Sequence, residues 1–382
     1  MGRSLLSGNV RAVLKDNAGW IAVLAILLVL LLAGAVTAAS SRGARARVDQ
    51  ALQATRRFAR RRPHRQHFRP EGAEVAEDKP RRAAIIINPT KFEDQSAVRR
   101  KIAKGCADAG WAEPLFIETT AEDTGEGQTR QALEEGVTVV CPLGGDGTVR
   151  AVASVLVGTE TPLGLLPGGT GNLLARNLDL PVDDLSEALK VALTGQNKRV
   201  DVGRIRVDAS GEHERPAEHV FLVMAGLGFD AAIMAGAPEA LKARVGWLAY
   251  GVAGVRNLRG AQFKVRLKVD DELEISRRVR TVVVGNCGKL TGGLVLMPKA
   301  EVDDGWLDAV TLSPKGIVGW LAVAARVLTR TRKGHERVDH LRGRELSIRS
   351  DRPEEVQLDG DTIGKALALG IRVEPGALVV RV

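Results

Sequence analysis

The 382-residue sequence contains only three cysteines, and their spacing excludes two common kinds of structural support. Cys106, Cys141 and Cys287 lie far apart and form no CxxC pair. The sequence therefore predicts neither a disulfide framework nor a structural zinc site, because both need paired or clustered thiols. A sparse, odd set of thiols is typical of a protein in a reducing compartment.

The body of the chain also lacks an excess of positive charge, although the net charge of the whole sequence is +9. Residues 1–82 carry 16 Lys and Arg against 6 Asp and Glu, so the remaining 300 residues carry 39 basic and 40 acidic side chains. A nearly neutral body gives no electrostatic reason to expect a nucleic-acid binder. We therefore expect no nucleic-acid partner.

Two common nucleotide-binding motifs are absent, since the chain has neither GxxxxGK[ST] nor GxGxxG. It has instead the loop GGDGT at residues 144–148, between a strand-like run at 137–141 and an apolar, helix-compatible run at 149–156. The start of a helix offers unpaired N–H groups and a positive dipole end, and glycine lets an anion approach them. The loop therefore predicts a phosphate site.

Asp146 is the unusual residue of this loop, because a carboxylate repels a phosphate unless a cation lies between them. The loop thus indicates a nucleotide bound together with Mg²⁺, directly or through water. The alternative is a plain glycine turn in which Asp146 is the N-cap of the following helix.

Strand-like and helix-like runs alternate from residue 81 to about residue 176, where a second glycine loop, PGGTGN, occupies 167–172. This alternation predicts an α/β domain with a parallel sheet, which binds ligands beyond the carboxyl ends of its strands. Asn88, Thr120 and both glycine loops follow predicted strands, so we expect them to converge at that edge. From about residue 177 the strand-like runs become dense, which predicts an antiparallel β-rich second domain.

The N-terminal region contains an uncharged run of 20 residues, 20–39, which is long enough to cross a bilayer as a helix. Arginines gather on its C-terminal side, so the positive-inside bias places the remainder in the cytoplasm. We predict a tail at 1–19, a single transmembrane helix at 20–39, and a basic linker at 40–80 that contacts anionic lipid or acts as a solvated tether. A cleaved signal peptide is the alternative, although the run is longer than a usual signal core.

The pair of loops, with PGGTGN following GGDGT after 18 residues, resembles the diacylglycerol kinase catalytic domain. That family includes sphingosine, ceramide and bacterial lipid kinases. Further family elements occur in order: INP at 87–89, DVG at 201–203, GLGFD at 226–230, GN at 285–286, PKA at 298–300, DDGWLD at 303–308, DGD at 359–361 and PGAL at 375–378. Each element is weak alone, and their order carries the resemblance.

The resemblance implies a nucleotide-binding domain at 81–176, to which residues 368–382 return, and a β-rich lipid-substrate domain at 177–367. It implies transfer of the γ-phosphoryl group of ATP to a lipid hydroxyl, with diacylglycerol as the first candidate, at the inner face of the cytoplasmic membrane. The alternatives are an NAD kinase-like kinase of a soluble substrate and a membrane-tethered nucleotide sensor without catalysis.

The resemblance also implies roles for individual residues. Asp359 would be the general base, assisted by Asp361. Asp146 and Asp201 would hold the catalytic Mg²⁺, and Asp304 matches a carboxylate that binds a structural Mg²⁺ in some bacterial members. The nucleotide contacts would come from Asn88, Thr120, Gly144, Gly145, Asp146, Gly147, Thr148, Gly169, Thr170 and Asn172.

Two positions depart from the family pattern. Many relatives carry Glu where this chain has Ala151, and a lost acid near the metal predicts a shifted coordination shell or weaker activity. Asp361 stands where the family has Glu, which keeps the charge but shortens its reach. Neither change removes the proposed base, so we expect an active kinase.

Overall fold

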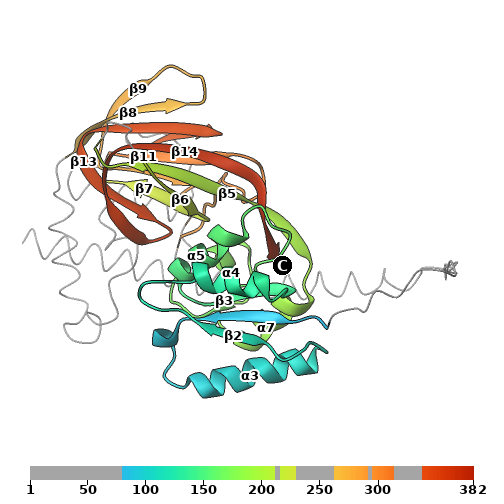
Figure 1. Ribbon diagram of the computed structural model, residues 1–382. Helices are drawn as coiled ribbons and strands as arrows, with labels where there is room; N and C mark the ends of the chain where they lie inside the picture. The colour runs from blue at the N-terminus through green and yellow to red at the C-terminus, as the bar shows by residue number, and fades with distance from the viewer. Residues whose placement is uncertain (1–79, 211–215, 229–261, 291–294, 314–337) are drawn as a thin grey trace, which may run out of the picture. The chain divides into compact units, whose positions relative to one another are not determined.

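The computed structural model describes residues 80–210, 216–228, 262–290, 295–313 and 338–382 (Figure 1). The chain divides into two units, Met1–Lys79 and Pro80–Val382. The predicted tail, transmembrane helix and basic linker fall within the first unit, outside the described residues.

The length and apolarity of the described helices can be compared with the predicted location in a membrane. None of them is long and apolar enough to cross a membrane. The longest, α3 (Gln95–Asp108), has 14 residues, so it extends about 21 Å, short of the roughly 30 Å of a bilayer core. This finding contradicts the predicted single-pass protein of the cytoplasmic membrane. The predicted span itself, residues 20–39, lies outside the described residues.

The first part of the described chain is built on a parallel sheet, as predicted. Its strand order is β2-β1-β3-β4, and the strands are β1 (Ala83–Ile87), β2 (Leu115–Glu118), β3 (Val139–Gly144) and β4 (Leu166–Pro167). Every residue of β1 and β3 is buried. Continuous apolar runs are typical of parallel strands that are covered on both faces.

Helices cover both faces of this sheet (Figure 1). Ile85 and Ile87 pack with residues of α3 and α7, whereas Ala84 and Ile86 pack with residues of α4 and α5. The alternation follows from the two-residue period of a strand. The elements are η1 (Pro89–Lys91), α3, α4 (Glu126–Glu134), α5 (Asp146–Leu156), α6 (Leu173–Asn177) and α7 (Leu185–Thr194).

The second part is an antiparallel β-rich domain, also as predicted. The described residues form a sheet of order β12-β11-β10-β7-β13-β14-β5-β6, with β8 and β9 joined to β13. The strands are β5 (Asn197–Asp208), β6 (Ala217–Phe221), β7 (Met224–Leu227), β8 (Phe263–Val269), β9 (Ile275–Val279), β10 (Thr281–Gly285), β11 (Leu307–Leu312), β12 (Val338–Gly343), β13 (Glu345–Leu358) and β14 (Asp361–Arg381).

The long strand β14 connects the two domains. It pairs with β13 and β5 in the second domain, and its last residues reach the first. Val380 forms a parallel bridge with Leu163, and the N–H of Arg381 donates to Leu163 O at 2.9 Å. The turn between β13 and β14 therefore lies at the start of β14, and the last residues of the same strand are bonded to the parallel-sheet domain.

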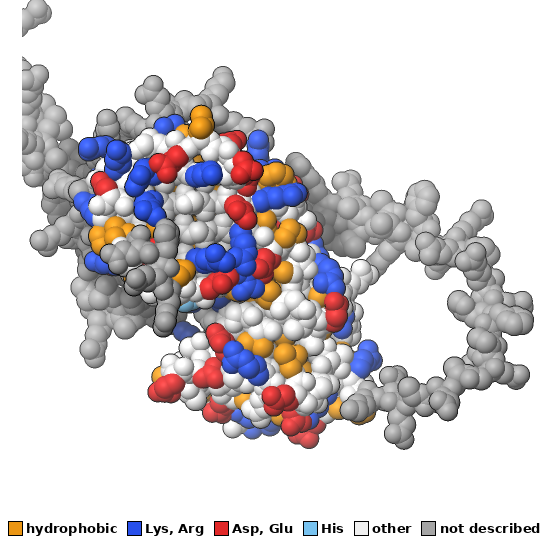
Figure 2. All heavy atoms as spheres, turned by 45° about the horizontal axis from the view of Figure 1, so that its top comes forward, with side chains coloured by type: hydrophobic (Ala, Val, Ile, Leu, Met, Phe, Trp, Pro, Cys, Tyr) orange, Lys and Arg blue, Asp and Glu red, His pale blue; other side chains and the backbone are white. Residues whose placement is uncertain are grey.

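The surface of the described residues mixes both signs of charge. On the face seen in Figure 2, basic and acidic side chains are interspersed over the described part of the chain. Arg204 donates to Glu374 at 2.7 Å, and Arg372 lies 3.4 Å from Glu218. Such pairs are consistent with the balanced charge of the sequence after residue 82.

Candidate active site

Two glycine loops follow β3 and β4 and touch each other through their backbones. A Cβ atom at Gly168 would lie 2.7 Å from Gly144 N, and one at Gly169 would lie 2.8 Å from Gly145 Cα. No side chain fits between the loops, so glycine is what permits their approach. Together they place backbone N–H groups around the start of α5, where helix geometry and dipole favour an anion.

Asp146 is the first residue of α5 and joins the two loops. Its Oδ1 accepts a hydrogen bond from Leu173 N at 2.6 Å, at the start of α6. Burial raises the pKa of Asp146 to about 6; the Leu173 hydrogen bond opposes the rise, and the charges of Asp359 and Asp361 add to it. A partly buried carboxylate beside two others favours a cation near it.

Asp359 lies in the two-residue turn between β13 and β14. Its φ is 50° and that of Gly360 is 98°, so both residues are left-handed, as in the tight turns of type I′ hairpins. The Asp359 side chain is buried. Its Oδ1 accepts hydrogen bonds from Val223 N (2.8 Å) and Met224 N (3.0 Å), and its Oδ2 accepts one from Leu222 N (3.0 Å).

The electrostatics of Asp359 reflect these surroundings. Burial raises its pKa, while the positive charge of Arg150 and the three backbone N–H groups oppose that rise. A buried carboxylate keeps its charge only where such donors and cations compensate for lost water. Asp359 is thus a fixed acceptor whose protonation depends on its neighbours.

A pocket of about 430 Å³ brings both loops and Asp359 together. Most of the predicted nucleotide contacts line it, and so do the two predicted catalytic residues. The lining residues are Asn88, Lys91, Thr124, Gly145, Asp146, Gly147, Thr148, Arg150, Gly169, Thr170, Gly171, Leu173, Asp359, Gly360 and Asp361.

Three predicted nucleotide residues lie outside this lining. The backbone of Gly144 lies against Gly168 of the second loop, and Asn172 donates from Nδ2 to Gly169 O at 2.8 Å. Both residues therefore shape the loops. Thr120 accepts a hydrogen bond from Asp123 N at its Oγ1, 3.0 Å away, and caps the turn that precedes α4. Thr124, four residues later, occupies the pocket instead.

Asp201 was predicted to bind the catalytic Mg²⁺, and in the structure its carboxylate accepts hydrogen bonds from two backbone N–H groups. It is buried and does not line the pocket. Its Oδ1 accepts from Gly376 N at 2.7 Å, and its Oδ2 accepts from Gly305 N at 2.6 Å. The carboxylate therefore ties β5 to the loop before β11 and to the irregular part of β14.

Asp304, the predicted ligand of a structural Mg²⁺, pairs with a cationic side chain. Its Oδ2 accepts from Arg342, and its Oδ1 accepts from Trp306 N at 3.0 Å. Burial raises its pKa, while the Trp306 N–H and Arg342 lower it. Within the described ranges, no cluster of three His, Cys, Asp or Glu side chains is arranged to hold a metal ion.

Ala151, the position where the family led us to expect an acid, is not among the residues that line the pocket. It is buried, and a Cβ atom at Gly125 would lie 3.5 Å from its Cβ. Ala151 thus packs against the start of α4. The neighbouring residue, Arg150, is the one that reaches the pocket.

The sequence reasoning missed two cations of this pocket, Lys91 and Arg150. Lys91 lies on η1, whose start is capped by Asn88 Oδ1 accepting from Thr90 N at 3.1 Å. The sequence signal that could have identified Lys91 is its place in the INPTK segment, as a basic residue just after the first strand. For Arg150, the signal was its place one turn into the helix that GGDGT begins.

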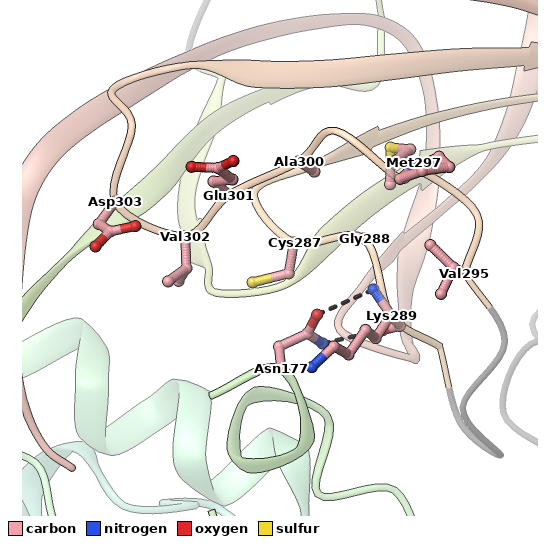
Figure 3. A pocket seen from close by; sticks show the side chains of 11 residues that line it. Asn177, Cys287, Gly288, Lys289, Val295, Met297, Ala300, Glu301, Val302 and Asp303 are labelled. Carbon is pink, nitrogen blue, oxygen red and sulfur yellow. Dashed lines mark hydrogen bonds between the residues drawn. The ribbon is translucent and has the colours of Figure 1, made fainter. Parts of the chain in front are cut away.

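A second cavity, also of about 430 Å³, lies at the other end of α6 (Figure 3). Leu173, the first residue of α6, lines the first pocket, and Asn177, the last, lines the second. Asn177 accepts from Lys289 N and donates to Lys289 O, both at 2.9 Å. The rest of the lining combines Gly288 and two acidic residues, Glu301 and Asp303, with six apolar residues: Cys287, Val295, Met297, Pro298, Ala300 and Val302.

Comparisons with known proteins assign both halves of this structure. The family model for the diacylglycerol kinase catalytic domain matches residues 82–205, and the model for the YegS C-terminal NAD kinase beta sandwich-like domain matches residues 223–382. The crystal structure of a diacylglycerol kinase from Bacillus anthracis aligns with a TM-score of 0.59 at 22% identity, covering 79% of this chain and 97% of that chain. That likeness shows the fold.

The curated proteins that are similar to this chain include diacylglycerol kinases. A diacylglycerol kinase of Mycobacterium tuberculosis is 33% identical over 178 residues, which cover 46% of this chain and 55% of that protein. A diacylglycerol kinase of Staphylococcus saprophyticus is 28% identical over 301 residues, covering 75% and 90% respectively. The chain spans about half the length of several curated relatives that it matches, 52% to 57%. With one family model matching the glycine-loop domain and the other the β-rich domain, the chain belongs to the diacylglycerol kinase catalytic-domain family.

Proposed function

We propose that this protein transfers the γ-phosphoryl group of ATP to a lipid hydroxyl, in the presence of Mg²⁺, with diacylglycerol as the first candidate acceptor. One observation carries the proposal: the glycine loops and the buried Asp359 carboxylate share a single pocket. Phosphoryl transfer needs donors that hold phosphate and a base near the attacking hydroxyl. The family membership supports the same reaction class.

The phosphates of ATP would lie against the glycine loops. Backbone N–H groups at the start of α5 would donate to phosphate oxygens, and no side chain at Gly145 or Gly147 stands in the way. The ammonium group of Lys91 adds a positive charge in the same pocket. Since this chemistry depends mainly on position and charge, these fixed groups supply much of what the reaction needs.

Asp146 suits a Mg²⁺ ion bound together with ATP. Its pKa of about 6 reflects a buried carboxylate crowded by two others, an arrangement that a cation would relieve. Mg²⁺ is commonly held by one or two carboxylates, with phosphates and water completing its shell. When bound, the ion neutralises charge on the transferred phosphoryl group.

Asp359 would accept the proton of the acceptor hydroxyl. As the lipid oxygen forms its bond to the γ-phosphorus, the bond from that phosphorus to the ADP oxygen breaks, and the hydroxyl proton moves to the Asp359 carboxylate. Among the described residues, Oδ2 accepts one hydrogen bond, from Leu222 N, and so keeps a lone pair for this proton.

The second cavity supports an acceptor with an apolar body. The Cys287 thiol lies on its wall and contacts Leu222 O at 3.7 Å, while the N–H of Leu222 donates to Asp359. Cys287 on the wall of this partly apolar cavity and the Asp359 carboxylate therefore both bond to the backbone of Leu222. A hydroxyl attached to an acyl-bearing body matches that arrangement better than a wholly polar acceptor does.

The test is phosphorylation of an acceptor panel with γ-labelled ATP: diacylglycerol, sphingosine, ceramide and NAD⁺. We expect labelled lipid from the wild type and a loss of about 10²–10⁴-fold in Asp359→Asn, with ATP binding retained. Asp271→Asn, an exposed carboxylate in the turn after β8, is the matched control. Label in NAD⁺ alone would establish the soluble-substrate alternative, and label in no acceptor would reject the proposal.

A further inference from the structure

Arg150 is a charged pocket residue to which the proposed reaction assigns no part. It lies on α5, four residues after Asp146, so the two side chains share one side of the helix. One terminal nitrogen of its guanidinium donates to Leu358 O, and the other donates to Asp361 Oδ2 at 2.9 Å. These acceptors lie on either side of Asp359 in the sequence.

We propose that Arg150 is a positioning residue that clamps the β13–β14 turn against α5 and so fixes the Asp359 carboxylate at the glycine loops. The reaction that it would serve rests on the proposed function, but the clamp itself rests on these contacts. Arg suits the task because its planar fork donates in two fixed directions at once.

The turn is a tight Asp-Gly connection that carries the proposed base, so the position of the carboxylate depends on what holds the turn. Asp359 has a φ of 50°, the left-handed conformation that Asp adopts in type I′ turns. On one side, the N–H groups of residues 222–224 hold its carboxylate. On the other, Arg150 holds the residue before it and the second residue after it. The base is therefore restrained from two independent elements.

The clamp also sets the charge around the base. The titratable and charged groups around Asp359 are Arg150 and Asp146 from α5, Cys287 from the segment after β10, Asp361 from the same hairpin, and Lys91 from η1, which lines the same pocket. Of the two cations, Arg150 is the one that bonds to the hairpin. It lowers the pKa of Asp359 against the rise caused by burial, so its removal would leave the base protonated up to a higher pH.

The experiment compares the pH dependence of kcat for the wild type, Arg150→Ala, Arg150→Lys and Arg199→Ala. Arg199 is a matched control outside the pocket, since its guanidinium likewise donates to a carbonyl, Gly376 O at 3.3 Å, and to a carboxylate, Glu160 at 2.7 Å. In Arg150→Ala we expect the acidic limb of kcat to move to higher pH, with activity on that limb below that of the wild type and recovering at higher pH.

The conservative variant separates charge from geometry. Arg150→Lys should keep the acidic limb near its wild-type position but lower the plateau of kcat, because an ammonium group cannot bridge the two acceptors as a fixed fork does. Arg199→Ala should follow the wild type throughout. An Arg150→Ala profile with an unmoved acidic limb would overturn the proposal, since a loss of general stability does not shift that limb.

Hydrogen exchange measures the clamp without relying on catalysis. Amides of residues 356–362 should exchange at least about tenfold faster in Arg150→Ala than in the wild type and Arg199→Ala, because local opening is no longer opposed. Unchanged exchange would overturn the clamp even if the wild type phosphorylated no lipid. In that case the proposed function would fail separately, and faster exchange would still support the clamp.

Discussion

Replacing Asp146 with Asn should make the ligand-free protein more stable while it abolishes the binding of ATP with Mg²⁺. Asp146 is partly buried, and its pKa is raised from 3.8 to about 6, first of all by burial. The folded protein therefore holds the Asp146 proton more tightly than the unfolded chain does. Ionisation of this group lowers stability as the pH rises from about 3.8 to about 6, and the full penalty is present above pH 6.

The size of the effect follows from the same values. A rise of the pKa from 3.8 to about 6 is worth about 3 kcal/mol. Against it stands the loss of a negative charge in the first turn of α5, which costs about 0.3–1 kcal/mol. An Asn oxygen can still accept the hydrogen bond from Leu173 N. We therefore expect Asp146→Asn to gain about 2–3 kcal/mol at pH 8, or about 3–5 °C in Tm.

Thermal unfolding at pH 4 and pH 8 measures this directly, with and without ATP and Mg²⁺. At pH 8 the variant should melt above the wild type, and at pH 4 the difference should nearly vanish because the wild-type carboxyl is mostly protonated. Added ATP and Mg²⁺ should raise Tm in the wild type but not in the variant. The exposed Asp271→Asn should match the wild type throughout. A variant less stable than the wild type at pH 8, or a gain independent of pH, would refute the reasoning.

Three further changes test other parts of the site. Gly168→Ala, whose Cβ would lie 2.7 Å from Gly144 N, should weaken ATP binding at least about tenfold by calorimetry, whereas Gly370→Ala, which meets no atom within 4 Å, should not. Lys91→Met should weaken ATP binding and reduce its dependence on ionic strength, measured between low and high salt; an unchanged salt dependence would remove Lys91 from the phosphate site. Asp201→Ala should lower the free energy of unfolding in urea by about 2–4 kcal/mol, because two backbone donors lose their acceptor. The concentration of Mg²⁺ that gives half-maximal activity should stay unchanged in Asp201→Ala if its role is structural; a clear increase would support its predicted role as a metal ligand.

The sequence predicted those parts of the fold and site that depend on neighbouring residues. Short stretches of sequence were enough to predict the buried strands β1 and β3 and the glycine loop before α5. Strand burial and helix starts have local signatures, which extend over about a dozen residues at most. The antiparallel domain was equally visible as closely spaced strands, for example the alternating pattern of β8. Asp359 was found through the order of family motifs, and no local pattern alone identified it.

The sequence did not predict contacts between residues that lie far apart along the chain. Asp201 bonds to residues 104 and 175 positions away, and Arg150 bonds to residues 208 and 211 positions away. Such partners are set by how β14 runs from the turn at Asp359 back to the parallel sheet, and periodicity does not encode that path. The presence of Thr124 in the pocket was not predicted for a related reason, since the turn after β2 decides which side chains line the pocket.

The central claim is that Asp359 and the glycine loops form one site for phosphoryl transfer to a lipid. Its most direct test is the transfer of label from γ-labelled ATP to diacylglycerol by the wild type and by Asp359→Asn under identical conditions. The account predicts labelled lipid with the wild type, at least about 100-fold less with the variant, and equal ATP binding in both. Equal labelling by the two proteins, or no labelled lipid from the wild type across the acceptor panel, would contradict it.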